Sequence, residues 1–221
     1  SLGPIESTNP CVTGYTRLAT SFGLMRMDDL VNKNEPFKVV SDYRGVDYST
    51  KGIVSRESSP AFVTSESEDV YKITTKHGHE IKTTSYHKFI TPKGRESLKD
   101  LKKGNKLFIQ SEEGMFGKEG IPELGLLMGM ISGDGWFTDD RGASIGLWGD
   151  DVQDLSSMIT NAVSIVIDSE SPTFVDVASR NMVMLRSRKL ASVLSKYGFN
   201  KLTKQIVPEV IWRGTRETVV K

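Results

Sequence analysis

Three residues of the chain carry side chains suited to catalysis, and each stands in a distinctive local sequence. Cys11 is the single cysteine among 221 residues and directly follows a proline. His87 closes a Thr-x-x-His stretch that begins at Thr84. Asp134 follows an apolar run that is interrupted by regularly spaced glycines. A thiol is a nucleophile, an imidazole exchanges protons near neutral pH, and a carboxylate binds hard divalent cations.

The sequence around Cys11 and His87 predicts a β-rich region that extends to about Ile109. Short β-branched or aromatic segments recur there, and Gly78 lies in a four-residue turn between two of them. Short helices are expected at Met25–Val31 and Leu98–Leu101. The expected strands are Phe37–Val40, Ala61–Val63, Val70–Thr75, Glu80–Thr84 and Lys106–Ile109.

After Pro122 the pattern changes to longer apolar helices that alternate with strands. A helix is expected around Leu124–Ile131, and another from a capping Asp150 or Asp151 to about Val166. The remaining expected elements are a strand at Ala143–Trp148, paired strands at Thr173–Val177 and Met182–Arg186, and a helix at Ser187–Tyr197.

Composition and charge are those of an ordinary globular protein. The chain is 37% hydrophobic and 26% charged, with a formal net charge of +1. Residues 121–221 hold 11 Lys and Arg against 12 Asp and Glu, so DNA binding would need a local basic face. A lone cysteine excludes an internal disulfide, and no segment reads as a membrane span or a signal peptide. A reducing, cytoplasmic setting is expected, with no membrane partner.

Two stretches of the β-rich region resemble those of inteins, the protein-splicing elements with a Hint-type fold. Cys11, Gly14 and Thr16 hold the places of the first intein residues, although Tyr15 stands where an acidic residue is common. The segment Met27–Val31 is similar to the family's next feature. The run Gly78–His87 resembles the block that ends in Thr-x-x-His, with Thr84 and His87 in its key positions. Leu101–Leu107 resembles the strand that closes the block, with Asn105 where aspartate is usual.

This resemblance implies an N-to-S acyl shift at the Pro10–Cys11 bond, which needs no cofactor. The Cys11 thiol would attack the carbonyl of Pro10 and form a thioester. His87 would give a proton to the departing amide nitrogen, and Thr84 would hold the scissile peptide in a distorted geometry. Proline before the bond restricts the local geometry, so a slow reaction is expected unless a partner chain is present.

The residues before Cys11 resemble a known host of inteins. Ser7-Thr8-Asn9-Pro10-Cys11 is similar to the active-site Asn-Pro-Cys stretch of ribonucleotide reductases. Residues 1–10 are therefore interpreted as the end of an N-extein, the host sequence that precedes an intein.

The run Leu127–Gly135, LMGMISGDG, resembles the signature helix of LAGLIDADG homing endonucleases. Glycines at 125, 129 and 133 would let two such helices approach closely, because glycine in a helix otherwise costs about 1 kcal/mol. The resemblance implies that Asp134, with Gly133 beside it, binds Mg²⁺ for DNA hydrolysis. Lys204 lies in a Lys…Val-Pro stretch that is similar to the one leading into a second signature helix. Lys204 is therefore interpreted as a DNA-contact candidate.

The predicted fold is the N-terminal part of a mostly-β, horseshoe-like Hint splicing domain followed by an α+β LAGLIDADG half of the order αββαββα. The predicted boundaries are residues 1–10 for the N-extein remnant and 11–112 for the Hint part. Residues 113–121 are the expected linker, and residues 122–221 the first half of the endonuclease.

Neither the C-terminal splicing residues nor a second signature helix follows in this sequence, so a complementary C-terminal intein fragment is the expected partner. A naturally split intein, an engineered or nicked fragment, and a dimerising single-motif endonuclease each explain this pattern. The exposed apolar face of the Leu124–Ile131 helix would then need a partner chain.

Rival interpretations remain for the whole chain and for single residues. A dimeric homing endonuclease that binds double-stranded DNA could use the β-rich part as an assembly module. A decayed endonuclease could serve only as a structural brace. Considered singly, Cys11 reads as a small buried hydrophobe and Thr84 as a strand residue. In the same way, Asp134 reads as a helix cap, Lys204 as a surface lysine, and His77 and His79 as turn residues.

Overall fold

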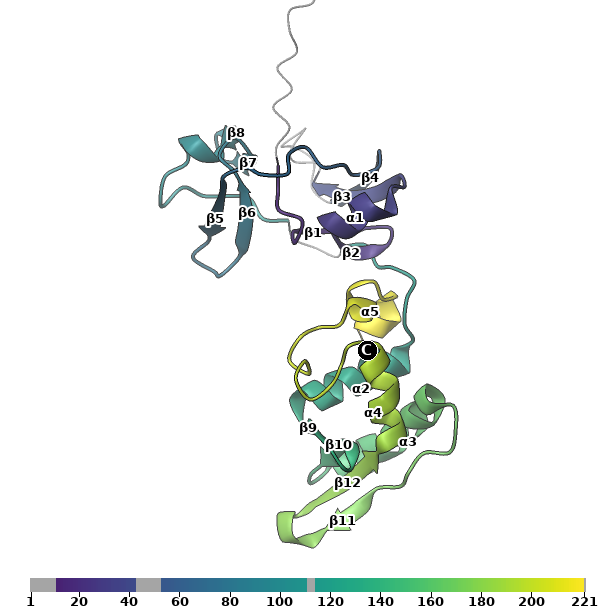
Figure 1. Ribbon diagram of the computed structural model, residues 1–221. Helices are drawn as coiled ribbons and strands as arrows, with labels where there is room; N and C mark the ends of the chain where they lie inside the picture. The colour runs from purple at the N-terminus through teal and green to yellow at the C-terminus, as the bar shows by residue number, and fades with distance from the viewer. Residues whose placement is uncertain (1–10, 43–52, 111–113, 221) are drawn as a thin grey trace, which may run out of the picture. The chain divides into compact units, whose positions relative to one another are not determined.

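The computed structural model describes residues 11–42, 53–110 and 114–220. The chain divides into two compact units, residues 1–116 and 117–221. The division falls inside the segment that the sequence predicts as a linker. Figure 1 shows a sheet-rich first unit and a second unit in which helices accompany one sheet.

The first unit contains a four-stranded antiparallel sheet and two separate hairpins. The sheet has the order β2-β1-β3-β4. One hairpin pairs β5 with β6 and the other pairs β7 with β8. The elements are β1 Arg17–Thr20, β2 Gly23–Arg26, α1 Met27–Lys33, β3 Phe37–Asp42, β4 Ile53–Ser58, β5 Val70–Thr74, β6 Glu80–Thr84, β7 Lys88–Thr91, β8 Gly94–Ser97 and the 3-10 helix η2 Leu98–Asp100.

The core of the first unit is small. Met25, Leu30 and Phe37 are buried together, and Ala61 is among the half-buried residues that pack against them. Elsewhere the strands are short and turn quickly. Gly78, for example, has a φ of 84° in the turn between β5 and β6, a backbone conformation that glycine adopts at no steric cost.

The second unit has the order αββαββα followed by two short helices. Its sheet has the order β11-β12-β10-β9 and is antiparallel throughout. The elements are α2 Pro122–Gly133, β9 Gly135–Thr138, β10 Gly142–Leu147, α3 Asp151–Ile167, β11 Val175–Val177, the 3-10 helix η3 Ala178–Arg180, β12 Met182–Ser187, α4 Arg188–Lys196, α5 Glu209–Trp212 and α6 Arg216–Val219.

One continuous core holds the second unit together. The helices α2, α3 and α4 all contact β10 (Figure 1). Alternate residues of this strand, Ala143, Ile145 and Leu147, are buried against apolar residues of the helices. The period of two along the strand and the helical spacing along α2 and α3 point these side chains into the same core.

Several sequence-based expectations are wrong. Ala61–Val63 and Lys106–Ile109 form no strand, and Phe62 and Val63 are exposed at 64% and 61%, respectively. The apolar face of α2 is not exposed, because Leu124, Leu127, Met128 and Ile131 are buried within its own unit. Asp150 is the residue before α3, but its side chain makes no capping hydrogen bond.

Candidate functional site

The segment that begins at Cys11 lies along the edge of β6. Val12 and Thr83 form an isolated antiparallel bridge. The Thr84 amide donates to the Cys11 carbonyl oxygen at 3.2 Å, and the Thr13 amide donates to the Lys82 carbonyl oxygen at 3.3 Å. The backbone of Cys11 is therefore held directly beside Thr84.

Thr84 lies at the centre of this arrangement. It ends β6, pairs with Val70 of β5 on one side, and is hydrogen-bonded to Cys11 on the other. Its side chain is only 1% exposed. The hydroxyl oxygen makes no hydrogen bond of normal geometry with any residue the structure describes, although Tyr86 lies near enough to interact with it. The Thr84 hydroxyl is therefore buried next to the backbone of Cys11 without a fully formed hydrogen bond of its own.

His87 follows Thr84 across a tight turn. The His87 amide donates to the Thr84 carbonyl oxygen at 3.2 Å, and the Leu98 amide donates to the His87 carbonyl oxygen at 2.9 Å. The imidazole packs against Phe89, with ring centroids 5.1 Å apart. Its Nδ1 is buried and has no hydrogen-bond partner among the described residues. Burial lowers the pKa of His87 below its ordinary value of 6.5, because a half-buried imidazole is less well solvated when charged.

The sulfur of Cys11 contacts a loop that the sequence did not single out. Cys11 Sγ lies 2.8 Å from Thr64 Oγ1, and either group can be the donor. Tyr86 is close as well. The pKa of its phenol is raised, first by partial desolvation and then by the charges of Glu68 and Cys11. No pattern in the sequence pointed to Thr64 or Glu68, whereas Tyr86 lies inside the predicted block and could have been noticed there.

The remaining predicted residues of this region separate into two groups. Pro10, which carries the carbonyl of the expected scissile bond, lies outside the described residues. His77 and His79 are exposed on the β5–β6 turn. Of the three histidines, His87 is thus the one that lies next to the residues that hold Cys11.

In the second unit, Asp134 follows the last residue of α2. Its amide donates to the Met130 carbonyl oxygen at 3.0 Å, while its side chain is exposed. Lys204 donates through Nζ to the carbonyl oxygens of Gly135 at 2.7 Å and Ile131 at 3.4 Å. Lys204 therefore contacts the carboxyl end of α2, where its positive charge interacts favourably with the helix dipole.

A Mg²⁺ ion at Asp134 is fitted only in part by these residues. Within residues 11–42, 53–110 and 114–220, no three acidic, histidine or cysteine side chains gather into a metal-binding group. Mg²⁺ takes one or two protein carboxylates and completes its shell with water and phosphate oxygens. Asp134 with the neighbouring Gly133 carbonyl supplies part of such a site, and no hydrolytic step follows from these two residues by themselves.

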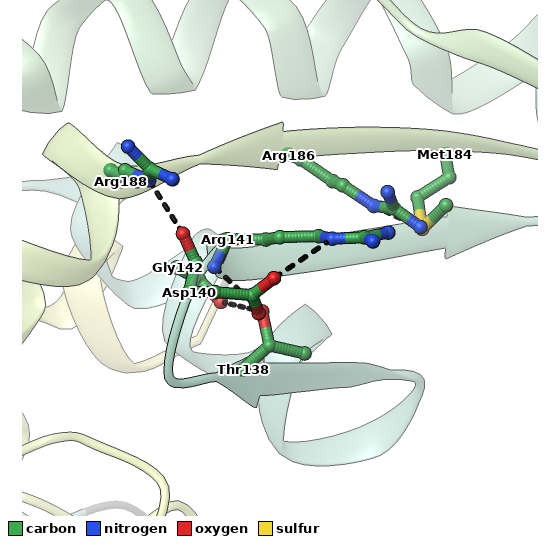
Figure 2. Close-up of polar contacts among 7 residues, drawn as sticks. All are labelled: Thr138, Asp140, Arg141, Gly142, Met184, Arg186 and Arg188. Atoms are coloured by element: carbon green, nitrogen blue, oxygen red, sulfur yellow. Dashed lines mark hydrogen bonds and ion pairs between the residues drawn. The ribbon is translucent and has the colours of Figure 1, made fainter.

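Three arginines gather around the β9–β10 turn and β12 (Figure 2). Arg141 Nε donates to Asp140 Oδ2 at 3.1 Å, and Arg188 Nε donates to the Asp140 carbonyl oxygen at 2.6 Å. Arg186 Nε lies 3.2 Å from the sulfur of Met184. Desolvation opposes the shift, but hydrogen bonds and the charges of Arg141 and Arg188 lower the pKa of Asp140. This carboxylate offsets part of the positive charge that the arginines present.

Sequence comparison relates almost the whole chain to part of a larger protein. The chain is 34% identical over 237 residues to the ribonucleoside-diphosphate reductase NrdEB subunit alpha of Bacillus subtilis (strain 168). The counterpart in Bacillus phage SPbeta matches equally well. In both cases 98% of this chain is covered, but the chain spans only 22% of the relative's length. No protein-family model matches the chain.

Two solved structures of inteins are similar to the chain at lower sequence identity. The DnaB intein from Synechocystis sp. PCC 6803 has a TM-score of 0.39 and 22% identity, covering 45% of this chain and 67% of that one. A DnaB mini-intein variant has a TM-score of 0.40 and 20% identity, covering 48% and 67%. By sequence, the comparisons thus relate the chain to part of a ribonucleotide reductase subunit.

Among the described residues, no helix is both long and apolar enough to cross a membrane.

Proposed function

We propose that the first unit is the part of an intein that carries the N-terminal splice junction, Pro10–Cys11. The observation that carries the proposal is the turn from Thr84 to His87, which holds the backbone of the single cysteine through the Thr84 amide. The same turn carries the His87 imidazole, whose buried Nδ1 has no hydrogen-bond partner among the described residues. A buried polar atom without a partner costs roughly 1–3 kcal/mol, so its position next to the residue that holds Cys11 supports a chemical role.

The reaction follows from these groups. The Cys11 thiolate attacks the carbonyl carbon of Pro10, and the bond between this carbon and the Cys11 nitrogen breaks. That nitrogen leaves with a proton from the His87 imidazolium, so a thioester and a free amino group replace the amide. The lowered pKa of His87 makes its protonated form a stronger acid, which favours transfer to the departing nitrogen. The Thr84 hydroxyl is available to hydrogen-bond the peptide during the step.

The host and the partner follow from the comparisons and the leader sequence. We assign residues 1–10 to the end of a ribonucleotide reductase N-extein, because the chain resembles a reductase subunit over 98% of its length. Complete splicing also needs groups at a C-terminal junction, for which a complementary C-terminal intein segment is the proposed partner. No cofactor is needed for these steps.

Release of the leader tests this function. The chain is mixed with dithiothreitol, with and without the complementary segment, and free residues 1–10 are quantified by mass spectrometry. We expect release when the segment is present, and none from Cys11→Ala. Rapid release without the segment would contradict the requirement for a partner. Equal release from the Cys11→Ala variant would overturn the proposal that Cys11 is the nucleophile.

A second function is favoured by one observation on residues 117–221. Their element order, αββαββα, is the order expected of one half of a LAGLIDADG endonuclease. Gly129 and Gly133 of α2 also have open space where a side chain would stand, which leaves room for a second helix. We propose that this unit derives from such a half, with Asp134 as the acid that binds Mg²⁺ and double-stranded DNA as substrate.

A nicking experiment distinguishes an active endonuclease from one that has lost its activity. A plasmid that carries the uninterrupted reductase gene is incubated with the protein and MgCl₂, and an Asp134→Asn variant serves as the matched control. Nicking that needs both Mg²⁺ and Asp134 would support an active endonuclease. Absence of nicking would favour the alternative, a unit that only braces the splicing part. Nicking that persists in Cys11→Ala would show that the two activities are separate.

A further inference from the structure

The loop between β4 and β5, residues 59–69, contacts the sulfur of Cys11 through Thr64. At its start Ala61 packs against the small core cluster, and at its end Val70 pairs with Thr84. Between them, Ser65 Oγ donates to the Ser67 carbonyl oxygen at 3.1 Å and accepts from the Ser67 amide at 3.3 Å, which closes a local turn. The loop is thus fixed at both ends and ordered in the middle.

Thr64 is the loop residue that reaches the nucleophile, with its hydroxyl 2.8 Å from Cys11 Sγ. We propose that Thr64 is the positioning residue of the Cys11 sulfur in the acyl shift, donating its hydroxyl proton to the thiolate. This inference rests on the proposed splicing function, but the contact itself can be measured without splicing.

The direction of the hydrogen bond follows from the chemistry of the two groups. A thiol can donate to a hydroxyl oxygen, whereas a thiolate can only accept. The same contact therefore serves both protonation states when the hydroxyl rotates. The bond to the anion is charge-assisted and stronger than the neutral one, so the contact favours the thiolate. When the proton of the thiol passes to solvent, the sulfur stays aimed by the loop.

The charged surroundings explain why such a donor is useful here. Partial desolvation raises the pKa of the Tyr86 phenol most, and the negative charges of Glu68 and Cys11 raise it further. Burial lowers the pKa of His87. A neutral hydroxyl donor stabilises the thiolate without adding a further titrating group.

The test measures alkylation of the single cysteine by iodoacetamide as a function of pH, in the full chain. Only the thiolate reacts, so the midpoint of the profile reports its population. Thr64→Val removes the hydroxyl but keeps the shape, and we expect the midpoint to rise by about one pH unit, the usual scale of a lost charge-assisted hydrogen bond. Thr64→Ser should restore the wild-type profile. Ser59→Ala, at the exposed start of the same loop, should leave it unchanged.

Leader release with the complementary segment provides the second readout. A tenfold lower thiolate population, partly offset by higher intrinsic nucleophilicity, predicts about a threefold slower acyl shift for Thr64→Val at neutral pH. An unchanged alkylation profile for Thr64→Val would overturn the proposal, as would a Ser59→Ala profile that shifts equally. If the profile shifts as expected but even wild-type protein releases no leader, the contact stands and the splicing function fails.

Discussion

The two units differ in the extent of their apolar cores, and the contrast separates a candidate reactive site from a packed scaffold. Residues 117–221 share one apolar core that runs through three helices and a sheet. Among the described residues of the first unit, a small apolar cluster surrounds Leu30, and the turn from Thr84 to His87 holds the backbone of Cys11 through hydrogen bonds. The first unit therefore depends on turns and polar contacts at the place where chemistry is proposed, whereas the second depends on apolar packing.

The largest expected effect tests the packed side of this contrast. Leu127→Ala empties a fully buried position of α2 and should cost the second unit about 3–4 kcal/mol, since the surrounding core cannot close the cavity. Hydrogen exchange of peptides from residues 117–221 measures the loss. Leu30→Ala in the smaller cluster should cost about 2 kcal/mol, near the low end for such changes. Equal costs in the two units would remove the distinction drawn between their cores.

The next effect concerns the reactive side. His87→Ala should slow leader release in the presence of the complementary segment about a hundredfold, because general acid catalysis contributes that order of magnitude. His77→Ala and His79→Ala are matched controls on the exposed turn and should release the leader at the wild-type rate. The assignment of His87 as proton donor fails if all three variants react alike.

The same contrast explains how far the sequence could predict the fold. In the second unit a helical period over α3 and strand alternation over β10 extend for many residues, so these elements were predicted almost to their ends. In the first unit β7 and β8 have four residues each, too few for a period to show, and they were missed. The prediction of a strand at Ala61–Val63 is wrong, because an aromatic and a β-branched residue favour a strand only where a partner strand can pair with them.

Prediction of the candidate site was limited in a similar way. Cys11, Thr84 and His87 could be selected because they belong to stretches whose spacing resembles that of a known family. Thr64 could not, because its contact with Cys11 spans 53 residues and arises from how the loop folds back. Lys204 could be noted but not understood, since its contacts with the end of α2 depend on tertiary structure.

Two glycines of α2 sharpen the view of the second unit as a scaffold. A Cβ at Gly125 would lie 1.9 Å from the Thr218 carbonyl oxygen, whereas one at Gly129 would meet nothing within 4 Å. Gly125→Ala should therefore destabilise the unit by about 1–3 kcal/mol, as overpacking does. Gly129→Ala should stabilise it by up to about 1 kcal/mol through helix propensity. Thermal unfolding of the two variants shows whether each stabilises or destabilises the unit. A destabilising Gly129→Ala would indicate that another chain packs against this face of α2.

A smaller effect is expected at the carboxyl end of α2. Lys204→Met keeps most of the side chain but loses the hydrogen bonds to Gly135 and Ile131. The loss should be about 1 kcal/mol, since a cation at a helix carboxyl end contributes on that scale. Lys196→Met, on an exposed part of α4, serves as the control and should be neutral in urea unfolding. If Lys204 acts instead only on DNA, its replacement will leave unfolding unchanged and weaken DNA binding.

The smallest expected effect is the pH dependence of the first unit. Because burial lowers the pKa of His87 in the folded chain, the unfolded chain binds a proton more readily. This contribution to stability is fully present above pH 6.5, the unfolded value, and is lost as the pH falls through the lower folded value. His87→Gln should flatten this part of the profile, as followed by hydrogen exchange of residues 80–99, while His79→Gln should not. Acidification also converts His87 into its donor form, so His87→Gln should abolish any rise in leader release on acidification.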